Sequence, residues 1–173
     1  DEELPGATLA IKDMDGNIVT TWVSTDEPHR VTGLHFGESY TLTEIRAAGG
    51  YALADNITFR LIQKTDEGGN PLEECQVYYL TTKNILFWKW DDWRLLDDAT
   101  VIMRDDITKV QISKKDLTTK EELHGAELTL TDEKGNEIDR WISTDAPHYM
   151  EKLPAGKYTL TEVTAPDGYA IAE

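Results

Sequence analysis

The chain has 173 residues, of which 39% are hydrophobic and 29% charged, and its formal net charge is −16. This composition is ordinary for a globular protein, and no apolar run approaches the roughly 18 residues that a membrane helix needs, so we expect no membrane insertion. The acidic charge argues against a nucleic-acid partner, because phosphates would be repelled, and the single cysteine, Cys75, excludes an intrachain disulfide and a thiolate zinc cluster.

Two stretches of alternating apolar and polar residues open the chain. Residues 7–13 and 18–23 read as strands, and Asp15-Gly16-Asn17 between them is a typical hairpin turn. Asp13 to Asn17 also resembles the start of a calcium loop, but no glutamate closes the twelve-residue pattern. We therefore expect a hairpin here and no metal site.

The segment YTLTEIRAAGGY, residues 40–51, directs a carboxylate toward the core. Tyr40, Leu42 and Glu44 alternate with two threonines, so the glutamate shares a strand face with two large apolar side chains. A lone buried carboxylate is unfavourable unless it is protonated, paired or hydrogen-bonded. Glu44 therefore needs a partner, and backbone amides are the simplest alternative.

An aromatic-rich segment follows within residues 56–100, and we expect it to form an inserted hairpin around residues 60–100. Trp88 and Trp90 fall on one face of a strand, and with Trp93 they would present a stacking platform for a sugar or a host protein. The alternative is that these rings cover the core beneath the hairpin. Their solvent exposure separates the two interpretations.

The next stretch, residues 100–116, contains two predicted strands that each direct one ionisable side chain inward. On the first strand Val101, Met103 and Asp105 share the inward face. On the second strand Val110, Ile112 and Lys114 share it. Asp106 competes with Asp105, but strand parity favours Asp105. For Lys114 the alternatives are a surface lysine at the strand end and a buried ion pair with Glu162.

The N-terminal segment returns near the C-terminus. LPGATLAIKDMDGN at residues 4–17 matches LHGAELTLTDEKGN at residues 123–136, so Gly6 corresponds to Gly125, 119 residues later. After one extra residue in the first copy the match continues, and Glu44 corresponds to Glu162. His29 and His148 lie in matching Pro-His loops, where no second histidine or cysteine nearby supports a metal role.

Repetition at this spacing indicates tandem domains, and short strands without helical periodicity indicate an all-β fold. We expect two immunoglobulin-like β-sandwich repeats, at residues 1–106 and 107–173, each truncated at one end. The first would lack its first strand and the second its last strand, so the chain would be a fragment of a longer array.

The inward lysine, glutamates and aspartate suggest a specific chemistry. Burial favours the neutral forms, so the lysine becomes a nucleophile and the carboxylic acid keeps its proton. An amine held against a protonated carboxyl group can condense to an amide, while the neighbouring glutamate shuttles protons in a single turnover. No other nucleophile and base pair, metal set or phosphate loop is apparent, so we expect neither a conventional enzyme nor a cofactor.

These residues resemble the collagen-adhesin B-type, or SpaA-like prealbumin-fold, domains of Gram-positive surface proteins and pilins. The matching segments are 112–116 (ISKKD), 123–126 (LHGA), 156–162 (GKYTLTE) and 165–169 (APDGY). The resemblance implies that Lys114 is the lysine of an isopeptide bond, that Asp105 is the acceptor, and that Glu44 and Glu162 are the assisting acids. Since neither repeat holds all three groups, we expect no bond within one domain, and an unchanged intact mass would agree.

The resemblance also implies a role and partners. We expect a structural stalk module of a cell-surface adhesin or pilin, outside the cell and anchored to the wall by a sortase signal beyond this fragment. Its partners would be neighbouring repeats, with strand exchange between chains as a further contact. The alternative function is binding of a host glycan or matrix protein by the tryptophan-rich hairpin.

Overall fold

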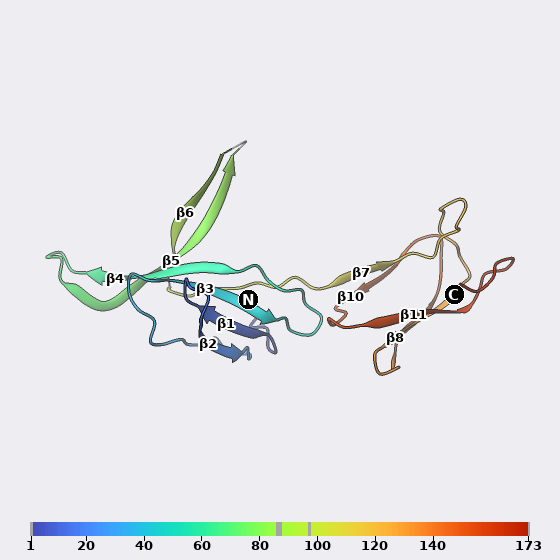
Figure 1. The fold of residues 1–173 in the computed structure, drawn as a ribbon, viewed down its shortest axis with the longest axis horizontal. Helices are drawn as coiled ribbons and strands as arrows, with labels where there is room; N and C mark the ends of the chain where they lie inside the picture. The colour runs from blue at the N-terminus through green and yellow to red at the C-terminus, as the bar shows by residue number, and fades with distance from the viewer. Residues whose placement is uncertain (1, 86–87, 97, 173) are drawn as a thin grey trace. The chain divides into compact units, whose positions relative to one another are not determined.

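The computed structural model describes residues 2–85, 88–96 and 98–172, which form eleven β-strands and no helix. The expected all-β fold is confirmed, and the described residues accordingly hold no helix capable of crossing a membrane. The chain divides into two compact units (Figure 1). The first unit comprises Asp1–Ala48 and Ala52–Asp106, and the second comprises Gly49–Tyr51 and Ile107–Glu173.

The first unit is built on a six-stranded antiparallel sheet in the order β2-β1-β3-β4-β5-β6. Its strands are β1 (Thr8–Lys12), β2 (Ile18–Val23), β3 (Ser39–Arg46), β4 (Ile57–Thr65), β5 (Pro71–Ile85) and β6 (Trp88–Leu96). The period-two alternation of β3 places its apolar side chains on the inner face. There they join a core cluster of Ile11, Tyr40, Leu42, Phe59 and Val77.

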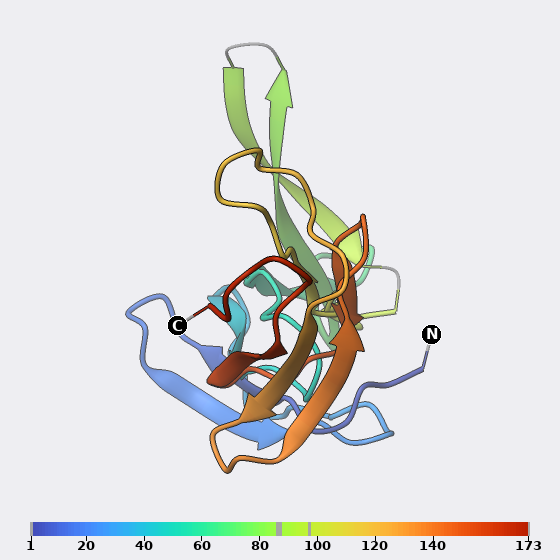
Figure 2. The same cartoon turned by 90° about the vertical axis from the view of Figure 1, so that its right-hand side faces the viewer.

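The last two strands of this sheet form a long arm. β5 pairs with β6 from Val77↔Leu96 to Ile85↔Trp88, and the distal half of the pair extends away from the rest of the unit (Figure 1, Figure 2). Residues 86 and 87, which connect the two strands, lie outside the described residues. The arm occupies the region in which the sequence indicates an inserted hairpin.

The second unit contains two small antiparallel sheets. The strands β8 (Glu127–Asp132), β9 (Glu137–Ile142) and β11 (Tyr158–Thr164) form one sheet in the order β11-β8-β9. The other sheet pairs β7 (Lys109–Ile112) with β10 (His148–Glu151). The buried hydrophobic side chains of the second unit include Ala126, Leu128 and Leu130, which lie on or next to β8.

The junction between the repeats differs from the sequence-based expectation. Residues 101–106 are not in a strand, although their side chains alternate between partly buried and exposed as a strand's would. Lys114 lies two residues beyond the end of β7, and the same alternation continues through it. The face of each side chain was therefore predictable from the period, whereas strand assignment also requires a hydrogen-bonded neighbour.

Three hairpin turns share one Asp-x-x-Gly-Asn pattern. In each, the aspartate carboxylate accepts hydrogen bonds from the backbone and side-chain amides of the asparagine four residues later, in the pairs Asp13–Asn17, Asp66–Asn70 and Asp132–Asn136. These bonds hold the pKa of each aspartate below its ordinary value. The carboxylates are thus occupied by the turn itself, as a hairpin requires.

Candidate functional site

Two buried glutamates occupy equivalent places in the two units. Glu44 lies on β3 and Glu162 on β11, and both are buried. After each strand the chain returns past the carboxylate, so a backbone amide ten residues later donates to it. Ala54 N lies 2.8 Å from Glu44 Oε2, and Ala172 N lies 2.6 Å from Glu162 Oε2. The amide partner expected as the simplest alternative is therefore present in both repeats.

In the second unit the glutamate also meets an amine. Lys114 Nζ lies 2.9 Å from Glu162 Oε1, and the lysine side chain is only 19% exposed. Burial alone would raise the pKa of Glu162, but the Ala172 amide and the Lys114 ammonium outweigh it and leave the pKa below its ordinary value. Glu162 is therefore a carboxylate in an ion pair with Lys114, which was one of the two alternatives for this lysine.

The backbone on both sides of Lys114 is fixed. Before it, Ile112 pairs with His148 in the β7–β10 sheet. At Lys114 itself, the carbonyl accepts a hydrogen bond of 2.7 Å from Leu123 N, and Lys115 forms an isolated bridge with Glu122. Main-chain contacts therefore hold the backbone at Lys114, so that mainly the side-chain rotamers must be ordered to keep the amine near Glu162.

A small cavity of about 110 Å³ adjoins this lysine. It is lined by Ile112, Lys114, Glu122, Trp141, Ile142, Ser143, Thr144, Ala146, Pro147, His148 and Tyr149. The Trp141 and His148 rings stack with centroids 4.3 Å apart, and His148 Nε2 lies 2.8 Å from Asp139 Oδ2. These contacts join β9 to β10 and so brace the sheet from which Lys114 emerges.

Sequence reasoning missed this stack, although a signal for it was present. A tryptophan precedes the histidine by seven residues in both copies, and Trp22 and His29 also stack, with centroids 4.4 Å apart. The histidines therefore have a packing role in each repeat. Among the residues that the structure describes, no group of three or more potential ligands could hold a metal ion.

In the first unit the glutamate meets an acid instead. Burial raises the pKa of Glu44, and the neighbouring Asp105 carboxyl raises it further. Burial likewise raises the pKa of Asp105, and a side-chain hydrogen bond with Glu44 offsets part of that rise. Protonation of at least one carboxyl group relieves their repulsion.

Parity distinguishes Asp105 from its neighbour. Asp105 is partly buried and faces Glu44, whereas Asp106 is exposed and its carbonyl accepts a hydrogen bond from Ala52 N. The structure thus brings together Lys114 with Glu162 in one unit and Asp105 with Glu44 in the other. Each unit thus brings together two of the three residue types, lysine, glutamate and aspartate, that the resemblance groups in one site.

The tryptophans of the arm do not share one face. Trp93 stacks over Arg60, whose Cζ lies 4.3 Å from the ring centroid and 5.6 Å from that of Tyr78. Trp90, at the opposite parity of β6, is 42% exposed. The side chain of Trp88 lies outside the described residues. Trp93 therefore covers the sheet beside Arg60, and Trp90 points away from that cluster.

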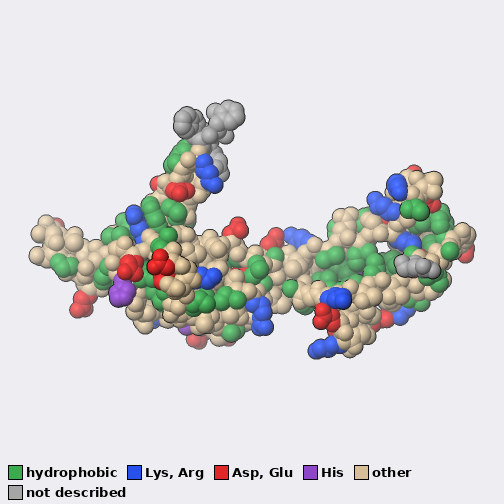
Figure 3. Space-filling view, in the orientation of Figure 1, with side chains coloured by type: hydrophobic (Ala, Val, Ile, Leu, Met, Phe, Trp, Pro, Cys, Tyr) green, Lys and Arg blue, Asp and Glu red, His purple; other side chains and the backbone are tan. Residues whose placement is uncertain are grey.

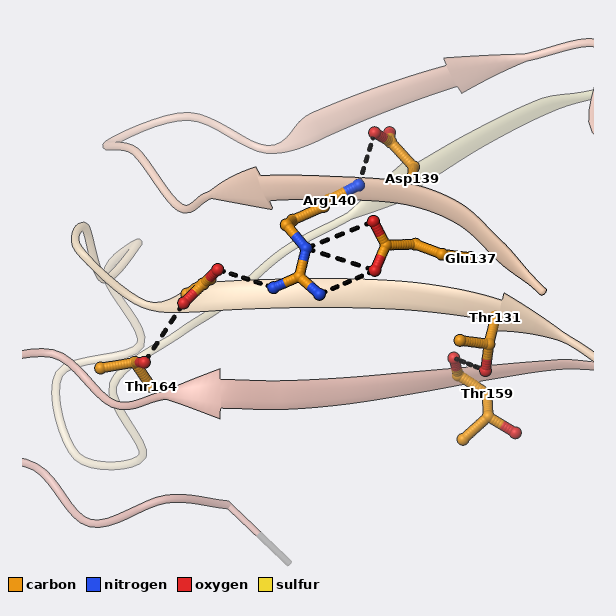
Figure 4. A network of polar contacts seen from close by, with 7 residues as sticks. Thr131, Glu137, Asp139, Arg140, Thr159 and Thr164 are labelled. Atoms are coloured by element: carbon orange, nitrogen blue, oxygen red, sulfur yellow. Dashed lines mark hydrogen bonds and ion pairs between the residues drawn. The ribbon is translucent and has the colours of Figure 1, made fainter. Parts of the chain in front are cut away.

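A polar network spans the three strands of the sheet that carries Glu162 (Figure 4). Arg140 on β9 contacts Glu137 and, at 2.7 Å, Glu127 on β8, which also accepts a hydrogen bond from Thr164 on β11. The two carboxylates raise the pKa of Arg140. Such exposed pairs contribute little singly, but the shared arginine fixes the lateral order of the strands.

The described strands form two all-β units, and each unit holds one buried glutamate. The family model named SpaA, described as a prealbumin-like fold domain, matches residues 1–70 and 108–173. These residues make up more than half of the chain. The chain therefore belongs to the SpaA prealbumin-like fold domain family, as its sequence motifs suggested.

Several solved structures are similar to the chain. The shaft pilin SpaA of Lactobacillus rhamnosus GG is 15% identical, with 98% of this chain and 81% of that chain covered and a TM-score of 0.38. The Bacillus anthracis TIE protein is 25% identical, with a TM-score of 0.39, and this chain covers 26% of its length with 98% of its own.

A C-terminal fragment of the pilus adhesin SpaC of Lactobacillus rhamnosus GG is 21% identical, with 95% of this chain and 69% of that chain covered and a TM-score of 0.35. No curated protein sequence matches the chain.

Proposed function

We propose that the chain is a structural repeat module of a bacterial cell-surface adhesin or pilin, stabilised by isopeptide bonds between lysine and aspartate. The observation that carries this proposal is the buried pair of Lys114 and Glu162, 2.9 Å apart. At the equivalent glutamate of the other repeat, Glu44, the neighbouring side chain is Asp105. The SpaA family model supports a module of this kind, and we further propose an extracellular location with anchoring to a Gram-positive cell wall.

The contacts suggest how the bond would form in the second unit. Glu162 first takes a proton from the Lys114 ammonium, which leaves a neutral amine beside a protonated glutamic acid. The amine then attacks the carbonyl carbon of a protonated acceptor carboxyl group. The C–N bond forms, the C–OH bond breaks, and one water leaves, so the reaction consumes its own side chains once.

In the proposed reaction the two units would take complementary parts. In the second unit the pKa of Glu162 is lowered, so the glutamate is ionised beside the Lys114 ammonium and is the base that would accept its proton. In the first unit the acceptor, Asp105, has a raised pKa and therefore a larger protonated fraction, which makes it a better electrophile. The first unit is the simpler one to test, because only the amine must be supplied.

The sequence itself supplies a lysine strand in register. In the match between the repeats, Asp1 corresponds to Lys120. A second copy of residues 107–119 fused before Asp1 therefore gives the first repeat a copy of Lys114 at the equivalent position. We expect the fused chain to be lighter by one water than its calculated mass, because that lysine would meet Glu44 and Asp105. Intact mass spectrometry measures this loss.

Matched variants show whether the bond arises as proposed. The fused chain with arginine in place of the copied lysine, and the fused chain carrying Glu44→Ala, should both keep their full mass. Hydrogen exchange of the copied segment establishes that it has docked. A docked segment with the lysine present and no loss of water would overturn the proposal for this unit.

One observation favours a second function, the binding of a host glycan or matrix protein. Trp90 is 42% exposed on the arm, so its ring is accessible for stacking on a sugar or a protein surface. We expect Trp90→Ala to abolish binding on a glycan or matrix-protein array. The control is Leu72→Ala, which removes an exposed apolar side chain on β5 and should leave binding unchanged. Equal loss in both variants, or no binding by the unmodified chain, would count against this function.

A further inference from the structure

One arginine of the six-stranded sheet has aromatic partners and no carboxylate. The Cζ atom of Arg60 on β4 lies 4.3 Å from the ring centroid of Trp93 on β6 and 5.6 Å from that of Tyr78 on β5. Its Nε atom is buried without a hydrogen-bond partner, and Arg60 forms no ion pair among the described residues. A buried donor of this kind is costly, because it has lost its bond to water and gained none in return.

Arg60 lies on the outer face of the sheet. It pairs with Ser39 on β3, and Glu44 lies five residues further along that strand, so Arg60 and Glu44 are on opposite faces. The core cluster and the buried carboxyl groups therefore lie on the other side of the sheet. Arg60, Tyr78 and Trp93, which we call the Arg60 cluster, are thus separate from the site at Glu44.

Carboxylates are abundant in the chain but are engaged elsewhere. The chain has 33 acidic and 17 basic residues, and Arg140 contacts two glutamates at 2.7 Å each. On the outer face of the six-stranded sheet, Glu74 forms an ion pair of 2.7 Å with Lys64, and Asp91 accepts a hydrogen bond from β5. A planar guanidinium matches the two oxygens of a carboxylate, so the unpaired donors of Arg60 indicate an external acceptor.

We propose that the Arg60 cluster is a binding site for a sugar that carries one carboxylate, of the uronic or sialic acid type. The guanidinium binds the carboxylate through paired hydrogen bonds. Tyr78 and Trp93 are only partly buried and Leu95, opposite Tyr78, is 43% exposed, so they offer an apolar surface to the C–H face of the sugar ring. The amide of Gln76, whose Oε1 lies 3.4 Å from the Tyr78 hydroxyl, adds hydrogen-bonding groups for sugar hydroxyls. Figure 3 shows hydrophobic side chains at the surface where the arm joins the first unit.

Charge and main-chain pairing both favour such a sugar over a polyanion or a peptide. The net charge of −16 repels a polymer that carries many negative charges, whereas one arginine balances one carboxylate. An extended peptide that binds a sheet adds to its edge, but β4 and β5 are interior strands with a neighbour on each side. The proposal depends neither on amide formation at Lys114 nor on binding at Trp90, which lies on the opposite face of β6 from Trp93.

The test is an NMR titration of the full chain with two acidic probes, the methyl glycosides of glucuronic acid and of N-acetylneuraminic acid. We expect at least one probe to shift the indole resonance of Trp93, which Trp93→Phe assigns. The methyl ester of the same sugar has no charge and should bind at least about tenfold more weakly. Arg60→Met, which keeps an apolar stem, should reduce the affinity by a similar factor. Lys64→Gln removes one positive charge from the same face and should leave the affinity unchanged.

Four results would overturn the proposal. No shift of Trp93 with either sugar would exclude a site at the cluster, and this comparison needs no variant. Equal affinity for the sugar and its ester, or for the unmodified chain and a folded Arg60→Met variant, would exclude recognition of the carboxylate by Arg60. Equal binding of a glutamate with both backbone ends blocked would identify an acidic peptide as the occupant. A shift of the Trp90 indole in place of Trp93 would assign the sugar to the other face of β6.

Discussion

Replacing Glu162 with glutamine is expected to destabilise the second unit far more than replacing Glu44 with glutamine destabilises the first. Glu162 is an ionised partner of a lysine that is only 19% exposed, and its loss leaves that ammonium without a counter-charge. We expect a cost of about 3 kcal/mol, near the lower end for removing one partner of a buried ion pair. Glutamine retains an acceptor for the Ala172 amide, so the change reports mainly on charge.

Glu44 provides the matched comparison. Its pKa is raised by burial and by Asp105, so glutamine imitates the protonated carboxyl group that this site favours. We expect a change in unfolding free energy of less than about 1 kcal/mol. Hydrogen exchange resolves the two units within one chain, where a single unfolding transition need not apply. Equal costs for the two substitutions would contradict the assigned ionisation states.

The two units should also respond to pH in opposite directions. Burial raises the pKa of Glu44 and Asp105 above their ordinary values of 4.5 and 3.8, so their contribution to stability is complete below those values. It is lost as the pH rises through the raised pKa values. For Glu162, whose pKa is lowered from 4.5, the contribution is present above that value and is lost as the pH falls through the lowered pKa.

Amide exchange across the acidic range measures this contrast. We expect the first unit to lose protection from these groups as the pH is raised from about 4, and the second to lose it as the pH is lowered below about 4. Exposed aspartates with lowered pKa values occur in both units and also make stability depend on pH. The contribution of each buried site is therefore the difference between the unmodified chain and a variant that lacks the glutamate. The trend should flatten in Glu44→Gln for the first unit and in Glu162→Gln for the second, and trends that persist in both variants would exclude these residues as their cause.

Much of this arrangement was predictable from residue alternation. The period-two pattern placed Glu44 and Glu162 on buried faces, and parity placed Asp105 rather than Asp106 on the face toward Glu44. These predictions depend only on which side of an extended chain a residue occupies. The same rule predicted the inward direction of Lys114, even though the strand ends before it.

The ionisation of the site was not predictable in the same way. Burial is common to both glutamates, yet the pKa of Glu44 is raised and that of Glu162 is lowered. The difference arises because a carboxyl group adjoins one and an ammonium adjoins the other. Such contacts form between segments far apart in the sequence, so local pattern alone does not determine them.

The arm shows a similar limit. The sequence grouped three tryptophans, and parity already separates Trp93 from the other two. The partner of Trp93 is Arg60 on β4, which became apparent only through the register of β4, β5 and β6. A stacking platform, if the arm binds a ligand, would therefore be centred on Trp90 rather than on all three rings.

The most direct test of the proposed amide bond, between Lys114 and an acceptor carboxyl group with Glu162 as the assisting acid, supplies that acceptor. A copy of residues 56–106 fused after Glu173 continues the second repeat in register, since Glu173 corresponds to Asp55, and supplies the counterpart of Asp105. Intact and tandem mass spectrometry of this extended chain should show the loss of one water and a peptide in which Lys114 is joined to the copied aspartate. A folded extended chain of full mass, with Lys114 unmodified, would contradict the account.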